Sequence, residues 1–63
     1  MNITHADLIA AAIPSGMDVS KDYEFFLDFA FENAVEIFDD ETARELFDRE
    51  DFVGELISAY EGR

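Results

Sequence analysis

Apolar residues recur along the chain at helical spacing, and residues typical of turns interrupt the pattern. Near the start, Thr4 and Asp7 form a capping-box pair, which satisfies free backbone N–H groups at the beginning of a helix. Pro14 disfavours helical geometry at the residue before it, and Ser15–Gly16 is typical of a turn. The pattern therefore predicts a first helix that ends just before Pro14.

The longest periodic segment follows, with Asp18 or Ser20 as its predicted cap and an end near Phe38. On a helical wheel of about 100° per residue, most of its apolar residues share one face. These residues are Tyr23, Phe26, Leu27, Ala30, Phe31, Ala34, Ile37 and Phe38. The opposite side carries Glu24, Asp28, Glu32 and Glu36, with Phe25 and Phe29 beside them.

A second interpretation of this segment is a strand, because every other residue from Tyr23 to Phe31 is apolar. A helix is preferred because the helical stripe continues to Phe38 and because the segment lacks the β-branched residues that strands favour. The predicted fold class is all-α, a compact three- or four-helix single domain over residues 1–63. The alternative is an α+β fold with a strand around residues 23–31.

Two further helices are predicted in the second half of the chain. Asp39 or Asp40 caps the third, and Asp51 caps the fourth, which Gly62 stops. A break at residues 48–51 is expected, because one continuous helix would turn Glu50 toward the core. The apolar stripes are Ala43, Leu46 and Phe47 in the third helix and Phe52, Val53, Leu56, Ile57 and Tyr60 in the fourth.

Length and composition limit what can hold such a domain together. The chain has 63 residues, no cysteine and 49% hydrophobic residues, seven of them Phe. A domain of this length buries only about 60% of the surface of its unfolded chain, so its stability is expected to be marginal. Without cysteine it has neither a disulfide nor a thiolate metal site, and an apolar core must supply the stability.

The net charge of −12 bears on function, because it is larger than solubility requires. Residues 22–55 carry thirteen acidic side chains against Arg44 and Arg49, a net charge of −11. A charge of magnitude about 2–8 is ample for the solubility of a small domain, and self-repulsion opposes compaction. The excess predicts a basic partner, and it argues against direct binding to nucleic acid or to an anionic membrane.

The spacing of the acids favours a specific partner class. Acids at i, i+4 on a helix lie about 6 Å apart, close to the separation of successive phosphates along a nucleic-acid strand. The predicted function is mimicry of backbone charge, with Glu24, Asp28, Glu32, Glu36, Asp39, Asp40, Glu41 and Glu45 as partner-binding residues. The competing interpretation is a surface that serves solubility alone. Phe25 and Phe29 are candidate apolar anchors, although packing against the first helix is the favoured interpretation of both.

Other chemistry has weaker support. The acidic runs lack the ligand spacing and the glycine of an EF-hand, and helix capping accounts for the same residues. Ser15, Ser20 and Ser58 accompany a single His5, without a nucleophile elbow, a P-loop or a dinucleotide fingerprint. We therefore expect no enzyme activity, no catalytic residues, no cofactor and no metal.

With its run of carboxylates, Glu24, Asp28, Glu32, Glu36 and Asp39-Asp40-Glu41, the chain resembles the small acidic DNA-mimic inhibitors encoded by phages and mobile elements. In length, charge and helical outline it is most similar to type I-C anti-CRISPR proteins. The resemblance implies a stoichiometric inhibitor that blocks DNA binding by a basic nucleic-acid-binding protein or CRISPR effector complex of the Cascade type, in the cytoplasm of a bacterial host.

Two alternatives to this function stay open. One is a small acidic interaction module, an antitoxin or adaptor, that buries Phe25, Phe29 or Tyr60 against its partner. The other is an acidic homo-oligomer that shares the Phe-rich helix between chains, so a monomer or a small homo-oligomer is expected. No basic segment follows Met1, and the longest uncharged stretch, residues 8–17, is too short to span a bilayer.

Overall fold

The structure, a computed structural model, describes residues 2–62 and contains within that range four α-helices and no strand. The helices are α1 (His5–Ala12), α2 (Tyr23–Ile37), α3 (Asp40–Asp48) and α4 (Phe52–Glu61). The all-α prediction is confirmed. The alternative strand around residues 23–31 is wrong, because this segment buries Phe26 and Ala30 at the i, i+4 spacing of a helix.

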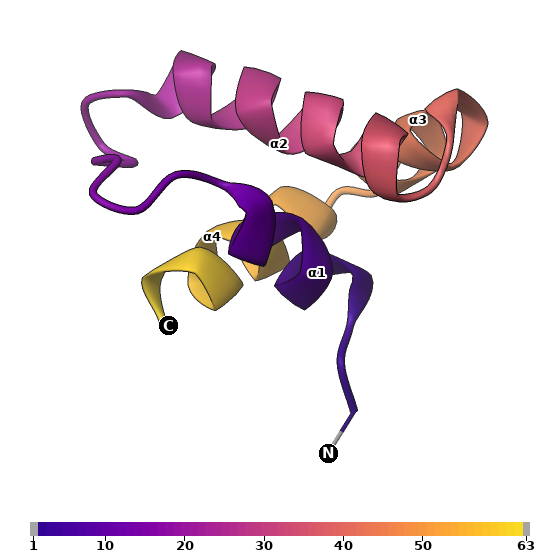
Figure 1. Ribbon diagram of the computed structural model, residues 1–63, viewed down its shortest axis with the longest axis horizontal. Helices are drawn as coiled ribbons and strands as arrows, with labels where there is room; N and C mark the ends of the chain where they lie inside the picture. Colours follow the sequence, from indigo (N-terminus) through magenta and orange to yellow (C-terminus); the bar gives the residue numbers. More distant parts are fainter. Residues whose placement is uncertain (1, 63) are drawn as a thin grey trace.

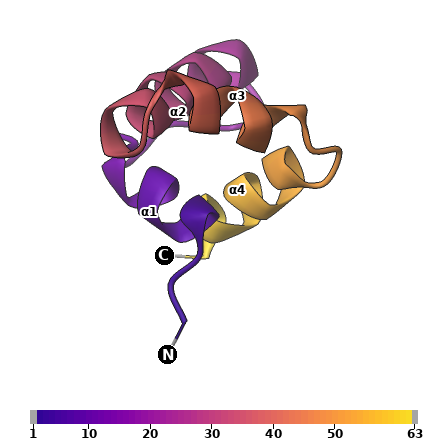
Figure 2. The same cartoon turned by 90° about the vertical axis from the view of Figure 1, so that its right-hand side faces the viewer.

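The four helices form two layers, with α2 and α3 in one and α1 and α4 in the other (Figure 1, Figure 2). Helix α1 packs against α4 and α2, and α3 packs against α2 and α4. The core therefore lies between the layers. Consequently α2, the longest helix, turns one side to the core and leaves the opposite side uncovered by the rest of the described chain (Figure 1).

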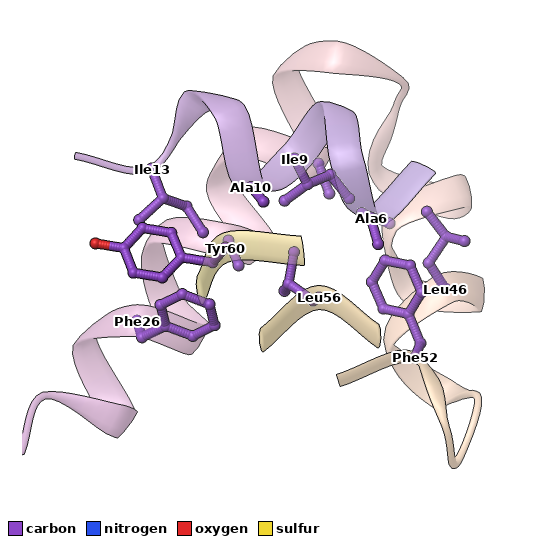
Figure 3. Packing of buried hydrophobic residues seen from close by; sticks show 12 residues of the cluster. Ala6, Ile9, Ala10, Ile13, Phe26, Leu46, Phe52, Leu56 and Tyr60 are labelled. Atoms are coloured by element: carbon purple, nitrogen blue, oxygen red, sulfur yellow. The ribbon is translucent and has the colours of Figure 1, made fainter. Parts of the chain in front are cut away.

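Large side chains from α2, α3 and α4 fill the core against the small and branched residues of α1. Phe26 lies beside Tyr60 and Ile13 at one end, while Ala6, Phe52 and Leu46 gather at the other (Figure 3). The Phe26 and Tyr60 rings meet edge to face with centroids 5.2 Å apart, a favourable geometry for an aromatic pair. The fully buried side chains include Phe26, Phe52, Ile9, Ile13 and Leu56.

The predicted caps of α1 and α3 are confirmed. The Thr4 hydroxyl accepts from the Asp7 N–H at 3.2 Å, and the Asp7 carboxylate accepts from the Thr4 N–H at 2.9 Å. The Asp39 carboxylate accepts from the Thr42 N–H at 2.6 Å at the start of α3. The predicted break between α3 and α4 is also present. Asp51 precedes α4 as predicted, but its side chain makes no capping bond.

The predicted cap of α2 is wrong. Neither Asp18 nor Ser20 caps this helix, which begins at Tyr23 after Asp22. The Asp18 carboxylate instead accepts from the Ser20 N–H and hydroxyl, at 3.0 and 2.7 Å, in a turn of its own. Short polar side chains often bond nearby backbone in this way. The turn therefore delays the start of the helix.

The connection between α1 and α2 is fixed by a side chain from the far end of the chain. The Tyr60 hydroxyl donates to the Pro14 carbonyl at 2.9 Å and accepts from the Met17 N–H at 3.0 Å. Between these two residues, Gly16 has φ of +88°, a left-handed conformation that glycine adopts without steric cost. Tyr60 is therefore a structural residue of this connection.

The ends of α2 depart from the predicted apolar face. Tyr23 and Ile37 were both assigned to the buried stripe, but they are 44% and 40% exposed. Each is the terminal residue of the helix, where the neighbouring helices no longer cover it. The centre of the stripe, Phe26, Ala30 and Ala34, is buried as predicted.

Candidate partner-binding surface

The outward side of α2 carries the four acids predicted to bind a partner. Glu24, Asp28, Glu32 and Glu36 are all exposed on this helix, and we call them the acidic row. Successive members are four residues apart, so they follow one another along the helix at intervals of about 6 Å. The structure therefore places the acidic row on a solvent-facing surface.

A second row runs beside the acidic row, one residue later at each step. It consists of Phe25, Phe29 and Ile37, with Asn33 between the last two, and we call it the apolar row. Phe25 is 65% exposed, and Phe29 and Ile37 are each 40% exposed. Single exposed apolar residues are ordinary, whereas several in one row make these residues candidates for a contact with a partner.

The favoured interpretation of Phe25 and Phe29, packing against the first helix, is wrong. Helix α2 turns Phe26 and Ala30 to the core, and a helix advances about 100° per residue. Phe25 and Phe29 each precede one of these buried residues, so their side chains are rotated away from the core. Both remain available as the candidate anchors that the sequence analysis named.

The acidic row is not neutralised within the described part of the chain. The ion pairs found among residues 2–62 join Arg44 to Asp40 at 2.9 Å, and Arg49 to Asp51 and Glu55 at 3.6 Å each. No basic residue occurs between Lys21 and Arg44. The outward surface of α2 is therefore strongly negative, because no positive side chain among residues 2–62 forms an ion pair with its carboxylates.

The acids of α3 are exposed as well, but some of them have structural partners. Asp39 caps the helix, and its hydrogen bonds with the Thr42 side chain and backbone lower the pKa of this carboxyl below the usual value. Asp40 pairs with Arg44. Glu41 and Glu45 are exposed and lie one turn apart on α3. Of the predicted residues on α3, these two extend the unpaired negative surface beyond the acidic row.

One residue of the apolar row contains an unsatisfied polar group. The Asn33 Nδ2 atom is buried and finds no hydrogen-bond acceptor among residues 2–62. Sequence reasoning named neither Asn33 nor Ile37 as part of an outward surface. The i, i+4 spacing of Phe25, Phe29, Asn33 and Ile37 was the signal that could have grouped them.

Tyr60, which the interaction-module alternative placed in an interface, is buried, and its hydroxyl is engaged with Pro14 and Met17. It therefore cannot anchor a partner without unfolding the end of α4. The predicted role is wrong for Tyr60, while Phe25 and Phe29 keep the exposure that such a role needs.

The described surface includes an open hollow of about 620 Å³ between the start of α1 and α4. Its two acids are already engaged, since Asp7 completes the cap of α1 and Glu55 pairs with Arg49. Its remaining lining is small or uncharged: Thr4, Ala6, Gly54, Ser58 and Ala59.

No His, Asp and Glu side chains of residues 2–62 gather in a group of three or more that could hold a metal ion. Within the same residues, no helix has both the length and the apolar character needed to cross a bilayer. Comparisons with known proteins found no matching family model, no similar curated protein and no similar solved structure.

Proposed function

We propose that this protein is a stoichiometric inhibitor that binds a basic nucleic-acid-binding protein and excludes nucleic acid from it. A CRISPR effector complex of the Cascade type is the specific target we propose. The observation that carries the proposal is the acidic row, four exposed carboxylates at phosphate-like spacing with no ion-pair partner among residues 2–62.

Two physical effects support this function. A groove lined with Lys and Arg binds nucleic acid largely through its phosphates, and a protein polyanion competes for the same cations. Opposite charge also speeds the encounter of the two proteins. A surface that serves solubility alone gains stability when bases are interleaved at i, i+4, and α2 has none.

The test is displacement of DNA. A Cascade-type effector complex and a panel of basic DNA-binding proteins are each loaded with labelled duplex DNA, and the purified chain is titrated in at low and high salt. The proposal predicts release of DNA from at least one target at a molar ratio near one to one, with weaker inhibition as salt rises.

Charge reversal tests which surface acts. The change of Glu24→Lys with Asp28→Lys is expected to abolish displacement while the fold survives, because both side chains are exposed. Glu50→Lys with Glu61→Lys is the matched control, since it changes the net charge equally outside α2. Failure to displace DNA from any target in dilute salt, or equal loss in both variants, contradicts the proposal.

A second candidate function rests on a different observation, the 65% exposure of Phe25. An antitoxin-like or adaptor-like module would bind chiefly through Phe25 and Phe29. This function predicts weak dependence on salt and a large loss of affinity on Phe25→Ala, the opposite of the pattern expected for charge mimicry.

A further inference from the structure

The acidic row and the apolar row lie side by side on α2, and charge mimicry alone needs only the first. Phe25, Phe29 and Ile37 leave apolar surface in water, which costs free energy that burial would recover. Phe25 and Phe29 lie beside the uncompensated carboxylates, and Ile37 is exposed at the end of α2, on the side that turns toward the core. A partner that covers both rows must therefore be apolar along one line and positive along the next.

From this juxtaposition we infer that α2 receives an amphipathic cationic helix of its partner. The apolar stripe of that helix covers Phe25, Phe29 and Ile37, and Lys or Arg on one flank pair with the acidic row. This inference rests on the proposed function and narrows it, because it names the element of the basic partner that is occupied.

The dimensions of the surface fit one helix. Each row spans thirteen residues of α2, from Glu24 to Glu36 and from Phe25 to Ile37, so its first and last residues are about 18 Å apart at 1.5 Å per residue. A partner helix of about twelve or more residues spans this length. An amphipathic helix that lays its apolar side on a complementary surface is a recurrent mode of recognition.

Charge decides between the candidate occupants. A second copy of this chain, with its net charge of −12, would bring another uncompensated acidic row against the first. Like charges brought together in an interface oppose association. An anionic lipid surface is repelled for the same reason. An amphipathic cationic helix would bury the apolar row and pair with the acidic row, so both contacts are favourable.

The probe is a pair of labelled synthetic peptides of about 18 residues, which is about five helical turns. One places Leu at i, i+3 and i+4 with Lys on the flanks; the other has the same composition in an order that spreads Leu around the helix. Fluorescence anisotropy at low salt measures the affinity of each peptide for the purified chain. The amphipathic peptide is expected to bind about tenfold or more tightly than its scrambled counterpart.

Variants locate the contact. Phe25→Gln with Phe29→Gln is expected to remove the preference for the amphipathic peptide, whereas Glu24→Gln with Asp28→Asn is expected to weaken both peptides. Leu8→Gln is the matched control, because Leu8 is 43% exposed on α1, away from both rows. Backbone amide shifts in NMR spectra are expected to cluster on α2.

The outcomes separate this inference from the proposed function. Equal binding of both peptides overturns the inference, while the proposed function remains supported if DNA is displaced. Equal effects of Leu8→Gln and the double Phe variant also overturn it, and so does failure of the chain to bind either peptide. In each case the displacement assay judges the proposed function independently.

Discussion

The acidic row makes the isolated domain less stable than it need be, and this cost can be measured. The four acids form three like-charged pairs at i, i+4, each between exposed side chains. A pair of this kind destabilises a helix by about 0.2–0.5 kcal/mol. Replacing Asp28 with Asn and Glu32 with Gln breaks all three pairs, because every pair contains at least one of these two residues.

The expected gain in free energy of unfolding is about 0.6–1.5 kcal/mol at low ionic strength, three times the cost of one such pair. For a domain of about 60 residues, each kcal/mol raises Tm by about 4–8 °C. The double variant should therefore melt several degrees above the wild type, although the same changes weaken binding to a basic partner under the proposed function.

Thermal unfolding followed by far-ultraviolet circular dichroism provides the assay, at two salt concentrations. At about 0.01 M salt the Debye length is about 30 Å, and at about 1 M it is about 3 Å, shorter than the spacing of about 6 Å within the row. The gain should disappear in concentrated salt. Glu50→Gln, outside any helix, is the control and should change Tm little.

Two results would refute this reasoning. If the double variant is no more stable than the wild type in dilute salt, the carboxylates of α2 do not repel one another appreciably. If the gain persists undiminished at about 1 M salt, it arises from helix propensity or packing and not from charge. Either result removes the argument that the charge is retained at a cost to the fold.

Three other predictions follow from particular contacts. Tyr60→Phe removes the partner of the Met17 N–H and the Pro14 carbonyl and should lower the free energy of unfolding by about 1–3 kcal/mol, measured by urea denaturation; an unchanged midpoint would contradict it. Asn33→Leu removes the unsatisfied Nδ2 and should stabilise by about 1–3 kcal/mol in the same assay; a loss of stability would show that the amide is satisfied. Because Thr42 lowers the folded-state pKa of Asp39, that contribution is complete above the ordinary pKa of 3.8 and is lost as pH falls through the lower folded value. Asp39→Ala should lower Tm at neutral pH by removing the cap of α3, and the difference in Tm from wild type should shrink below pH 3.8; a constant difference would argue against it.

The parts of the fold that the sequence predicts correctly depend on local chemistry. Thr4 with Asp7, and Asp39 ahead of α3, cap their helices as predicted, because a capping bond joins residues only three apart. The break before α4 follows from the conflict that a continuous helix would create at Glu50. The predicted start of α2 is wrong because Asp18 bonds Ser20 in a turn instead of capping the helix. Two local bonding patterns compete there, and the sequence does not show which one forms.

The parts that the sequence does not predict depend on which helix packs where. A wheel places Phe25 and Phe29 at the edge of the apolar face, and it cannot say whether α1 covers that edge. In the structure α1 leaves both Phe residues exposed, Phe25 more so than Phe29. Tyr23 and Ile37 lie outside the core for a related reason, since the neighbouring helices do not cover the ends of α2.

The candidate site divides in the same way. The acidic row could be predicted, because charged residues at i, i+4 opposite an apolar stripe face solvent in almost any helical packing. The apolar row could not, because Ile37 fits the core face on the wheel. Tyr60 is buried in the apolar stripe predicted for the fourth helix. The alternative that placed it in an interface is wrong, and the sequence could not show this, because its bonds join residues more than 40 apart.

The position of α4 has a consequence for the way the protein folds. Helix α1 has its buried face against α4, and the Tyr60 hydroxyl fixes the connection that follows α1. Although α1 also packs against α2, the bonds that hold its connection join residues more than 40 positions apart in sequence. Because such long-range contacts form together with the helices they join, loss of α4 should also release the connection after α1, and folding of the domain should be all-or-none.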